Sequence, residues 1–341
     1  GAIIWAPRGQ TGTNVRPDGV KGGEPVDLAT GVFVHSETDL AIPGRIPIII
    51  KRDYRTLDTF RGPYGIGTYF SYDWYMLRSG NMATLVIPPG TRVSFNRQPD
   101  GSFINNDEPM YRGTRVTFNP DGTSTLRMKD GMTYKFDVYG LLVEQKDRNG
   151  NKLRFLREYE GNVTKIVGPD GRTMVTFSLY ILGRDVIKEM TDITGRTVTY
   201  TYDISYYQGT RTGLLKSVTN PEGGITQYQY DSQGRMTAII DPRGNTTVRN
   251  IYDLNSRICR QEQADGGIWK FYYITADRAT TPQNLKLLSE AESGGPITQT
   301  DCSAQLSSSP VVATIVVDPR GNPTTYRFNG KGSMLSATSA L

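Results

Sequence analysis

Apolar and polar residues alternate one by one along short stretches of this chain. Thr226, Tyr228 and Tyr230 fall on one side of an extended backbone, and the two glutamines between them fall on the other. Residues 199–202 alternate in the same way. Because successive side chains of a strand point to opposite faces, this pattern predicts half-buried β-strands. Helical spacing is hardly present, so we expect few or no helices.

Short turns separate the alternating stretches. In Asp241-Pro242-Arg243-Gly244 the aspartate can accept a hydrogen bond from the backbone two residues on, the proline presets φ, and the glycine accepts a positive φ. Asp231 and Gly234 repeat the outer two placements. Residues 235–240 and 245–252 are rich in Ile, Thr, Val and Tyr, so they are predicted to be successive strands of an antiparallel meander.

The turn recurs along the chain at a nearly regular spacing. Its predicted residues are Asp147, Gly150, Gly171, Asp192, Gly195, Gly223, Asp231, Gly234, Asp241, Pro242, Gly244, Gly266, Asp318 and Gly321. The interval from Gly266 to Gly321 is about twice the others, which predicts a degenerate repeat at residues 293–298, Ser-Gly-Gly-Pro-Ile-Thr. Gly131 adds a repeat at the front. One hairpin per period of about 20 to 28 residues indicates a repeat array whose long sheet must twist and curl.

Composition agrees with many strands and turns. The 341 residues include 37 glycines, 20 tyrosines and 19 prolines. Because only 37% of the residues are apolar, an elongated or hollow form suits the chain better than one large spherical core. Lys and Arg number 39 against 34 Asp and Glu, and the net charge of +5 is spread along the chain. A nucleic-acid partner is therefore not expected.

The compartment is only partly indicated by the sequence. No apolar stretch is long enough to span a bilayer, and the apolar group at residues 46–50 is interrupted by Pro47. Residues 1–7 lack the basic region and apolar core of a signal peptide, so we expect a chain that is cut from something longer or exported without one. Cys259 and Cys302 are too few for a disulfide framework or a thiolate metal site, and whether they bond to each other stays open.

The repeated motif resembles that of the RHS/YD-repeat family, in which Tyr-Asp-x-x-Gly-Arg is followed by Asp-Pro-x-Gly. The matching residues are Tyr230, Asp231, Gly234, Arg235, Asp241, Pro242, Gly244, Asn245, Tyr252, Asp253, Asp318, Pro319, Gly321 and Asn322. Upstream, residues 25–31, 37–40, 43–47 and 52–55 look like the domain that opens such arrays in bacterial members. The resemblance covers about residues 24–341.

The resemblance implies an all-β fold in which antiparallel β-hairpin (YD/RHS) repeats form a curled sheet, part of a hollow shell. Residues 1–23 are then a linker or extended N-terminal segment, residues 24–130 the opening β domain, and residues 131–341 the repeat array. The implied function is that of a structural shell module of a bacterial secreted toxin, which encloses and helps deliver a C-terminal toxic cargo.

The same resemblance implies partners and a location. The expected partners are the remainder of the shell and the toxic cargo domain, with a secretion apparatus, a spike component and glycans as further candidates. The chain looks like an N-terminal piece of a shell, and it is expected to be secreted or exported from a bacterium, or held at the cell surface. The last strand is expected near Thr324–Phe328, with an unpaired edge that pairs, docks or frays. No cofactor or metal is expected.

Candidate catalytic residues have simpler structural explanations. A carboxylate pair could hydrolyse a glycosidic bond, but the turn positions already explain the recurring aspartates. His35 lies near Ser36 and Asp39 in the sequence, yet neighbours on one strand point to alternate faces, so a Ser-His-Asp triad is not expected.

Candidate binding motifs are similarly weak. Gly65-Ile66-Gly67 lacks the third glycine and the following helix of a dinucleotide fingerprint. Trp5, Trp74 and Trp269 could stack on sugars, but packing between strands is the simpler role. Two rival functions stay open: a carbohydrate- or receptor-binding adhesion module on the same scaffold, and an enzyme.

Overall fold

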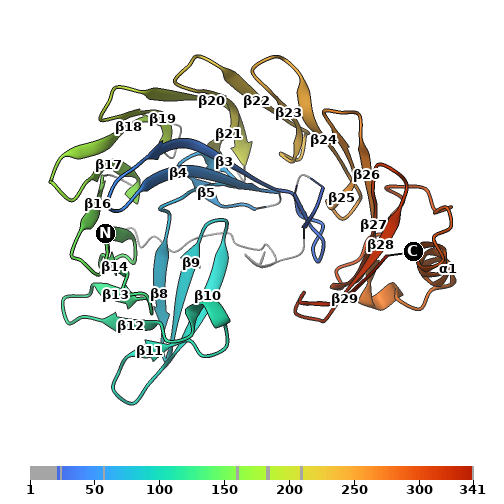
Figure 1. Cartoon of the computed structure of the whole chain (residues 1–341), viewed down its shortest axis with the longest axis horizontal. Helices are drawn as coiled ribbons and strands as arrows, with labels where there is room; N and C mark the ends of the chain where they lie inside the picture. Colours follow the sequence, from blue (N-terminus) through green and yellow to red (C-terminus); the bar gives the residue numbers. More distant parts are fainter. Residues whose placement is uncertain are drawn as a thin grey trace. The chain divides into compact units, whose positions relative to one another are not determined.

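The computed structural model describes residues 21–23, 25–56, 58–158, 161–181, 185–207 and 210–339. These residues divide into two compact units. The first unit holds residues 36–53 and 58–224, and the second holds residues 21–35, 54–56 and 225–339. Both units are built mainly from antiparallel strands, as the alternation of side chains predicts (Figure 1).

In the first unit, strands from β8 to β21 pair with the next strand along the chain. They are β8 (Tyr75–Ser79), β9 (Met82–Ile87), β10 (Thr91–Arg97), β11 (Phe103–Ile104), β12 (Arg115–Phe118), β13 (Ser124–Arg127), β14 (Thr133–Phe136), β15 (Leu142–Lys146), β16 (Lys152–Arg157), β17 (Val163–Val167), β18 (Thr173–Ile181), β19 (Asp185–Asp192), β20 (Thr197–Tyr207) and β21 (Thr210–Thr219). The short helix η1 (Pro109–Tyr111) lies between β11 and β12. The sheet thus grows hairpin by hairpin (Figure 1).

The first strands of this unit curl until β8 meets the turn before β15. Met76 N donates to Gly140 O at 2.8 Å, and Leu142 N donates to Trp74 O at 3.2 Å. A Cβ on Gly140 would lie 2.3 Å from Met76 O, so only glycine allows this approach. The strands from β8 to β15 therefore form a closed run within the unit.

A second layer covers one face of the large sheet in the first unit. It contains the sheet β3 (Val34–Ile42), β4 (Ile48–Arg55) and β7 (Thr68–Phe70), and the pair β5 (Arg61–Gly62) and β6 (Gly65–Ile66). The ring centroid of Phe70 lies 5.5 Å from that of Phe177 on β18, and the centroid of Tyr64 lies 5.0 Å from that of Tyr200 on β20. Because these large rings are buried, the two layers share an aromatic core.

The second unit repeats the hairpin plan. Its strands are β1 (Lys21–Gly22), β2 (Val26–Asp27), β22 (Ile225–Tyr230), β23 (Met236–Ile240), β24 (Thr246–Tyr252), β25 (Ile258–Gln263), β26 (Ile268–Thr275), β27 (Val311–Val317), β28 (Pro323–Phe328) and β29 (Met334–Ser339). Residues 28–31 pack against these strands. Ile258 N donates to Gly31 O at 2.9 Å, and Thr314 Oγ1 donates to Leu28 O at 2.6 Å.

The long interval between Gly266 and Gly321 is not two repeats. β26 pairs directly with β27, and the residues between them form the short helix η3 (Ala276–Arg278), the helix α1 (Pro282–Glu292) and a loop. The degenerate repeat expected at residues 293–298 is therefore wrong, because these residues follow a helix and pair with no strand. The expectation that helices are few is confirmed, since the described residues contain only α1 and the short helices η1 and η3.

The helix has clear local causes. Thr281 Oγ1 accepts a hydrogen bond from Asn284 N at 3.4 Å, and Pro282 stands in the first turn, where its missing N–H costs nothing. Leu287 and Ala291 lie four residues apart, so they share one face, and that face is buried against β26 and β27. Packing on the sheet thus holds a helix whose other faces are mostly exposed.

The expectation that the last strand lies near Thr324–Phe328 is also wrong. β28 has a strand on each side, since it pairs with β27 and with β29. The turn into β29 is built on Asn329, whose Oδ1 accepts from Lys331 N and Ser333 N at 2.9 Å each. Asn329 takes the place that aspartate has in many of the other turns, as Asn220 also does.

Candidate functional site

In several of the repeat turns, one aspartate side chain holds two backbone groups. Asp241 Oδ1 accepts from Arg243 N at 2.9 Å and from Asn245 N at 2.8 Å. Gly244 N donates to Asp241 O at 2.9 Å, and Gly244 has a φ of 86°. No atom lies within 4 Å of the position that a Cβ on Gly244 would take. Glycine is therefore required by the positive φ and not by lack of room for a side chain. The hydrogen bond from the Asn245 backbone, above the other contacts, holds the pKa of Asp241 below its ordinary value.

The predicted turn residues occupy corresponding places elsewhere. An aspartate Oδ1 accepts from the backbone N–H groups two and four residues on at Asp147, Asp192, Asp231 and Asp318. Pro242 directly follows the first residue of its turn. A positive φ occurs at Gly150, Gly171, Gly195, Gly223, Gly234, Gly244, Gly266 and Gly321. The structure therefore distributes these residues over separate turns and gathers none of them into one site.

A buried ion pair lies in the first unit. Arg52 Nε donates to Asp39 Oδ2 at 2.6 Å, and Arg52 Nη2 donates to Asp39 Oδ1 at 2.8 Å. Tyr200 OH on β20 donates to Asp39 Oδ2 at 2.8 Å. Burial raises the pKa of Tyr200 well above its usual value, so its hydroxyl keeps the proton that it donates. The cluster joins the small sheet to the large one.

The triad residues considered in the sequence are not brought together. The ring of His35 lies 6.1 Å from the ring of Phe33 and 6.1 Å from the ring of Tyr228, as a packed aromatic would. The hydroxyl of Ser36 donates to Asp53. Among the described residues, no group of three or more His, Cys, Asp or Glu side chains is placed to hold a metal ion.

The residues of the binding motifs considered in the sequence lie in strands or pack against other side chains. Gly65 lies in β6, where a Cβ would come within 2.3 Å of Gly213 O. The ring of Trp74 stacks on that of Tyr134 with centroids 4.6 Å apart. Trp269 belongs to β26, and its indole nitrogen is buried without a hydrogen-bond partner. Trp5 lies outside the described residues.

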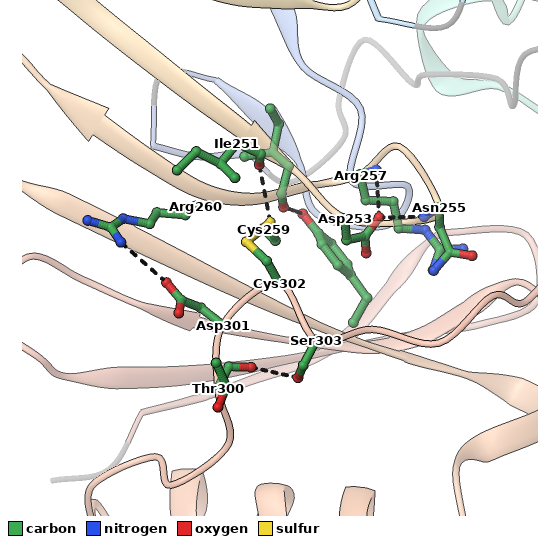
Figure 2. Close-up of a disulfide and its surroundings, with 12 residues drawn as sticks. Ile251, Asp253, Asn255, Arg257, Cys259, Arg260, Thr300, Asp301, Cys302 and Ser303 are labelled. Atoms are coloured by element: carbon green, nitrogen blue, oxygen red, sulfur yellow. Dashed lines mark hydrogen bonds and ion pairs between the residues drawn. A yellow bond between two sulfur atoms is a disulfide. The ribbon is translucent and has the colours of Figure 1, made fainter. Parts of the chain in front are cut away.

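A disulfide joins Cys259 of β25 to Cys302, which answers the question that the sequence left open (Figure 2). The bond ties the loop after α1 back to the sheet. Beside it is a cavity of about 390 Å³, whose walls come from the turn between β24 and β25, from β26, from the start of α1 and from the loop. No sequence motif indicates this cavity. In the turn between β24 and β25, Ser256 stands where other turns have glycine and has a φ of 58°.

Family comparisons match two parts of the chain. A family model described as "RHS Repeat" matches residues 210–246, and one described as "Domain of unknown function (DUF6531)" matches residues 23–95. The first covers strands β21 to β23 and the start of the turn–strand unit after them. In the described part of the chain, helices are too short or too polar to cross a membrane.

Known proteins with similar sequences include bacterial toxins and nucleases. "Double-stranded DNA deaminase toxin A" of Burkholderia cenocepacia is 26% identical over 274 residues, which are 76% of this chain and 18% of that protein. "Probable deoxyribonuclease RhsA" of Dickeya dadantii is 24% identical over 276 residues, which are 78% of this chain and 18% of that protein. The chain thus spans less than a fifth of the length of these relatives.

Among solved structures, the crystal structure titled "TcdB2-TccC3-TEV" is 14% identical with a TM-score of 0.32, over 90% of this chain and 16% of that one. Three observations indicate the same kind of repeat. They are the matched repeat model, the related sequences, and the Tyr-Asp and Asp-Pro turn motifs. Residues 210–246 thus match the RHS-repeat model, and the turn motifs of the chain resemble those of the RHS/YD-repeat family.

Proposed function

We propose that the chain is a structural module in the wall of a shell that encloses a toxic cargo in a bacterial secreted toxin, and that it performs no chemistry of its own. The observation that carries this proposal is the pairing of each strand with the next from β8 to β21. A sheet built in this way extends by adding hairpins, which is the property that a wall requires. The toxin names of the related proteins support the toxin context.

A structural role fits the way in which the carboxylates are used. In Asp147 and Asp241, the two carboxylate oxygens accept backbone and side-chain N–H groups of their own turns. The Asn151 side chain, as the largest influence, lowers the pKa of Asp147, and the Asn245 backbone does the same for Asp241. A carboxyl group with a lowered pKa is a poor general acid at neutral pH.

The proposal includes partners and a location. The partners are the remainder of the shell and its cargo, with residues 24–130 as the opening domain and residues 131–341 as the array. The disulfide between Cys259 and Cys302 supports export, because such bonds persist in oxidising compartments.

Protease protection tests the proposal on the full gene product that carries this chain. Gly244→Val forces an unfavourable φ on a turn, whereas Gly330→Val changes a glycine that has no positive φ and no atom within 4 Å of its Cβ position. We expect the segment after the array to resist a protease in the parent and in Gly330→Val, and to be cleaved faster in Gly244→Val. Equal cleavage of that segment in the parent and in the denatured protein would refute the proposal.

A further inference from the structure

Cations gather on the outward face of strands β12 to β16 in the first unit. Alternate residues of these strands, such as Val116, Leu126 and Phe136, are buried, so the residues between them point away from the core. The cations at these outward positions are Arg115, Arg127, Lys135, Lys146, Lys152 and Arg154. We call this surface the basic face. Glu144 supplies the one carboxylate among the outward positions of the same strands.

Part of the basic face forms a single line across the strands. Arg115 of β12 lies opposite Arg127 of β13. Lys146 of β15 lies opposite Lys152 of β16. Thr133 of β14 lies between Arg127 and Lys146. Because neighbouring strands are about 4.8 Å apart, the line from Arg115 to Lys152 is roughly 19 Å long.

This arrangement is not the one that stability alone favours, because like charges directly opposite each other weaken a sheet. The two ends of the line are compensated, since Arg115 Nη1 lies 2.6 Å from Asp100 Oδ2 and Lys152 Nζ lies 3.2 Å from Glu144 Oε2. Within the part of the chain that the structure describes, Arg127 and Lys146 make no ion pair. These two cations therefore indicate a negatively charged partner outside the chain.

The carboxylates near the basic face do not cancel its charge. Glu144 lies between Lys135 and Arg154 in the cross-strand pairing, so one carboxylate faces two cations. Asp121 Oδ1, in the turn before β13, accepts from Thr123 N at 3.0 Å and from Thr123 Oγ1 at 2.7 Å. The Thr123 hydroxyl, above the other influences, holds the pKa of Asp121 below its ordinary value, and Lys135 adds a smaller effect. The basic face keeps a surplus of positive charge.

The other outward residues restrict the chemistry of the partner. Proteins that bind single-stranded nucleic acid add aromatic side chains on which the bases stack, and none of the outward positions on β12 to β16 is aromatic. The major groove of DNA admits a helix or a two-stranded ribbon, and a face of five strands is too wide for it. Thr117 and Thr125, which lie opposite each other on the basic face, offer hydroxyls that can bond to the hydroxyls of a sugar.

We therefore infer that the basic face binds a linear acidic polysaccharide that runs across strands β12 to β16, with Arg127 and Lys146 as its main contacts. This role concerns only the first unit and does not depend on the wall function proposed above. Spacing along the sequence could not indicate it, because the cations come from five strands and the net charge of the whole chain is only +5.

Fluorescence anisotropy on the whole chain tests the inference. The probe is a fluorescein-labelled heparin dodecasaccharide, and the unlabelled competitors are heparin, neutral dextran and an oligothymidylate matched to the probe in number of charges. We expect binding that weakens as salt is raised, competition by heparin at lower concentrations than by oligothymidylate, and no competition by dextran. Arg127→Gln/Lys146→Gln should weaken heparin binding about fivefold, since two exposed ionic contacts are lost.

Two matched variants separate the basic face from general positive charge. Arg243→Gln/Lys331→Gln removes the same charge from exposed turns of the second unit, so it should change heparin binding less than about twofold. Arg127→Lys/Lys146→Arg keeps the charge and should bind like the parent.

The melting temperature excludes unfolding as the cause of weaker binding. Arg127→Gln/Lys146→Gln should keep or raise it, because like charges no longer lie opposite each other. Absence of heparin binding, equal weakening by the two glutamine double variants, or competition by oligothymidylate as strong as that by heparin would overturn the inference.

Discussion

Replacing Asp39 with asparagine should destabilise the first unit strongly. The change removes the carboxylate that accepts two hydrogen bonds from Arg52 while leaving the guanidinium in place, and the side chains of Asp39 and Arg52 are only 3% and 4% exposed. Removing one partner of a buried ion pair costs about 3–5 kcal/mol, because the other charge stays buried after losing its closest opposite charge. The Tyr200 hydroxyl also loses a charged acceptor at 2.8 Å.

The magnitude can be compared with that of an exposed pair in the same unit. Lys216 Nζ lies 3.0 Å from Asp203 Oδ1, but these side chains are 59% and 55% exposed. Exposed pairs contribute about 0–1 kcal/mol, since water solvates the charges that remain. Asp203→Asn is therefore the control for Asp39→Asn.

Thermal unfolding followed by circular dichroism measures the difference. For a domain of 150–250 residues, 1 kcal/mol shifts Tm by about 2–4 °C, so we expect Asp39→Asn to lower the transition of the first unit by roughly 6–20 °C. Adding Arg52→Met to Asp39→Asn should recover part of the loss, because the buried guanidinium is then removed as well. Equal shifts for Asp39→Asn and Asp203→Asn would refute the reasoning.

Three further predictions concern the turns and the disulfide. Gly244→Val should lower the free energy of unfolding by about 1–3 kcal/mol, because valine must adopt a φ near 86°; an unchanged urea midpoint would contradict the turn's role. The lowered pKa values of Asp147 and Asp241 contribute stability above the unfolded-state pKa near 3.9, which is lost as the pH falls through the folded-state values. The urea midpoint should therefore fall between pH 5 and pH 2, and less so in Asp241→Asn; identical pH profiles would count against it. Cys259→Ser/Cys302→Ser should cost about 2–4 kcal/mol in a denaturant titration, since the bond closes a 43-residue separation; equal midpoints for the variant and the oxidised parent would show that the bond constrains little.

The hairpins were predictable because their chemistry is local. The residues that close a turn, such as Asp241 and Asn245, lie four positions apart, and the glycine between them accepts the required φ. The strand faces follow from alternation, so Tyr228 is buried while its neighbours Gln227 and Gln229 are exposed. These features depend on a few adjacent residues and on no contact elsewhere in the fold.

The helix α1 was not predicted, because the regular spacing of the turns led to the expectation of another hairpin in its place. Thr281-Pro282 is a recognisable helix start, yet the doubled interval up to Gly321 favoured another repeat. The Gly-Gly-Pro sequence at residues 294–296 is typical of turns and loops in general, and it does not require a strand on either side. Local composition alone could not distinguish a loop after a helix from a hairpin.

The buried pair and the cavity could not be predicted from spacing. Asp39 and Tyr200 lie 161 residues apart, and the cavity brings Asp253 together with Gln299 from a loop beyond α1. The ion pair depends on how β3 and β4 pack on the large sheet, and the cavity depends on how α1 and the loop after it pack on β25 and β26. Neither kind of packing leaves a periodic trace in the sequence.

Electron cryo-microscopy of the full gene product tests the central claim most directly. If this chain is part of a shell wall, its hairpins should continue side by side into further hairpins of the same protein, and the sheet should enclose density for another part of that protein. Density for the remaining domains that lies wholly outside the sheet, with the sheet itself open and empty, would contradict the account.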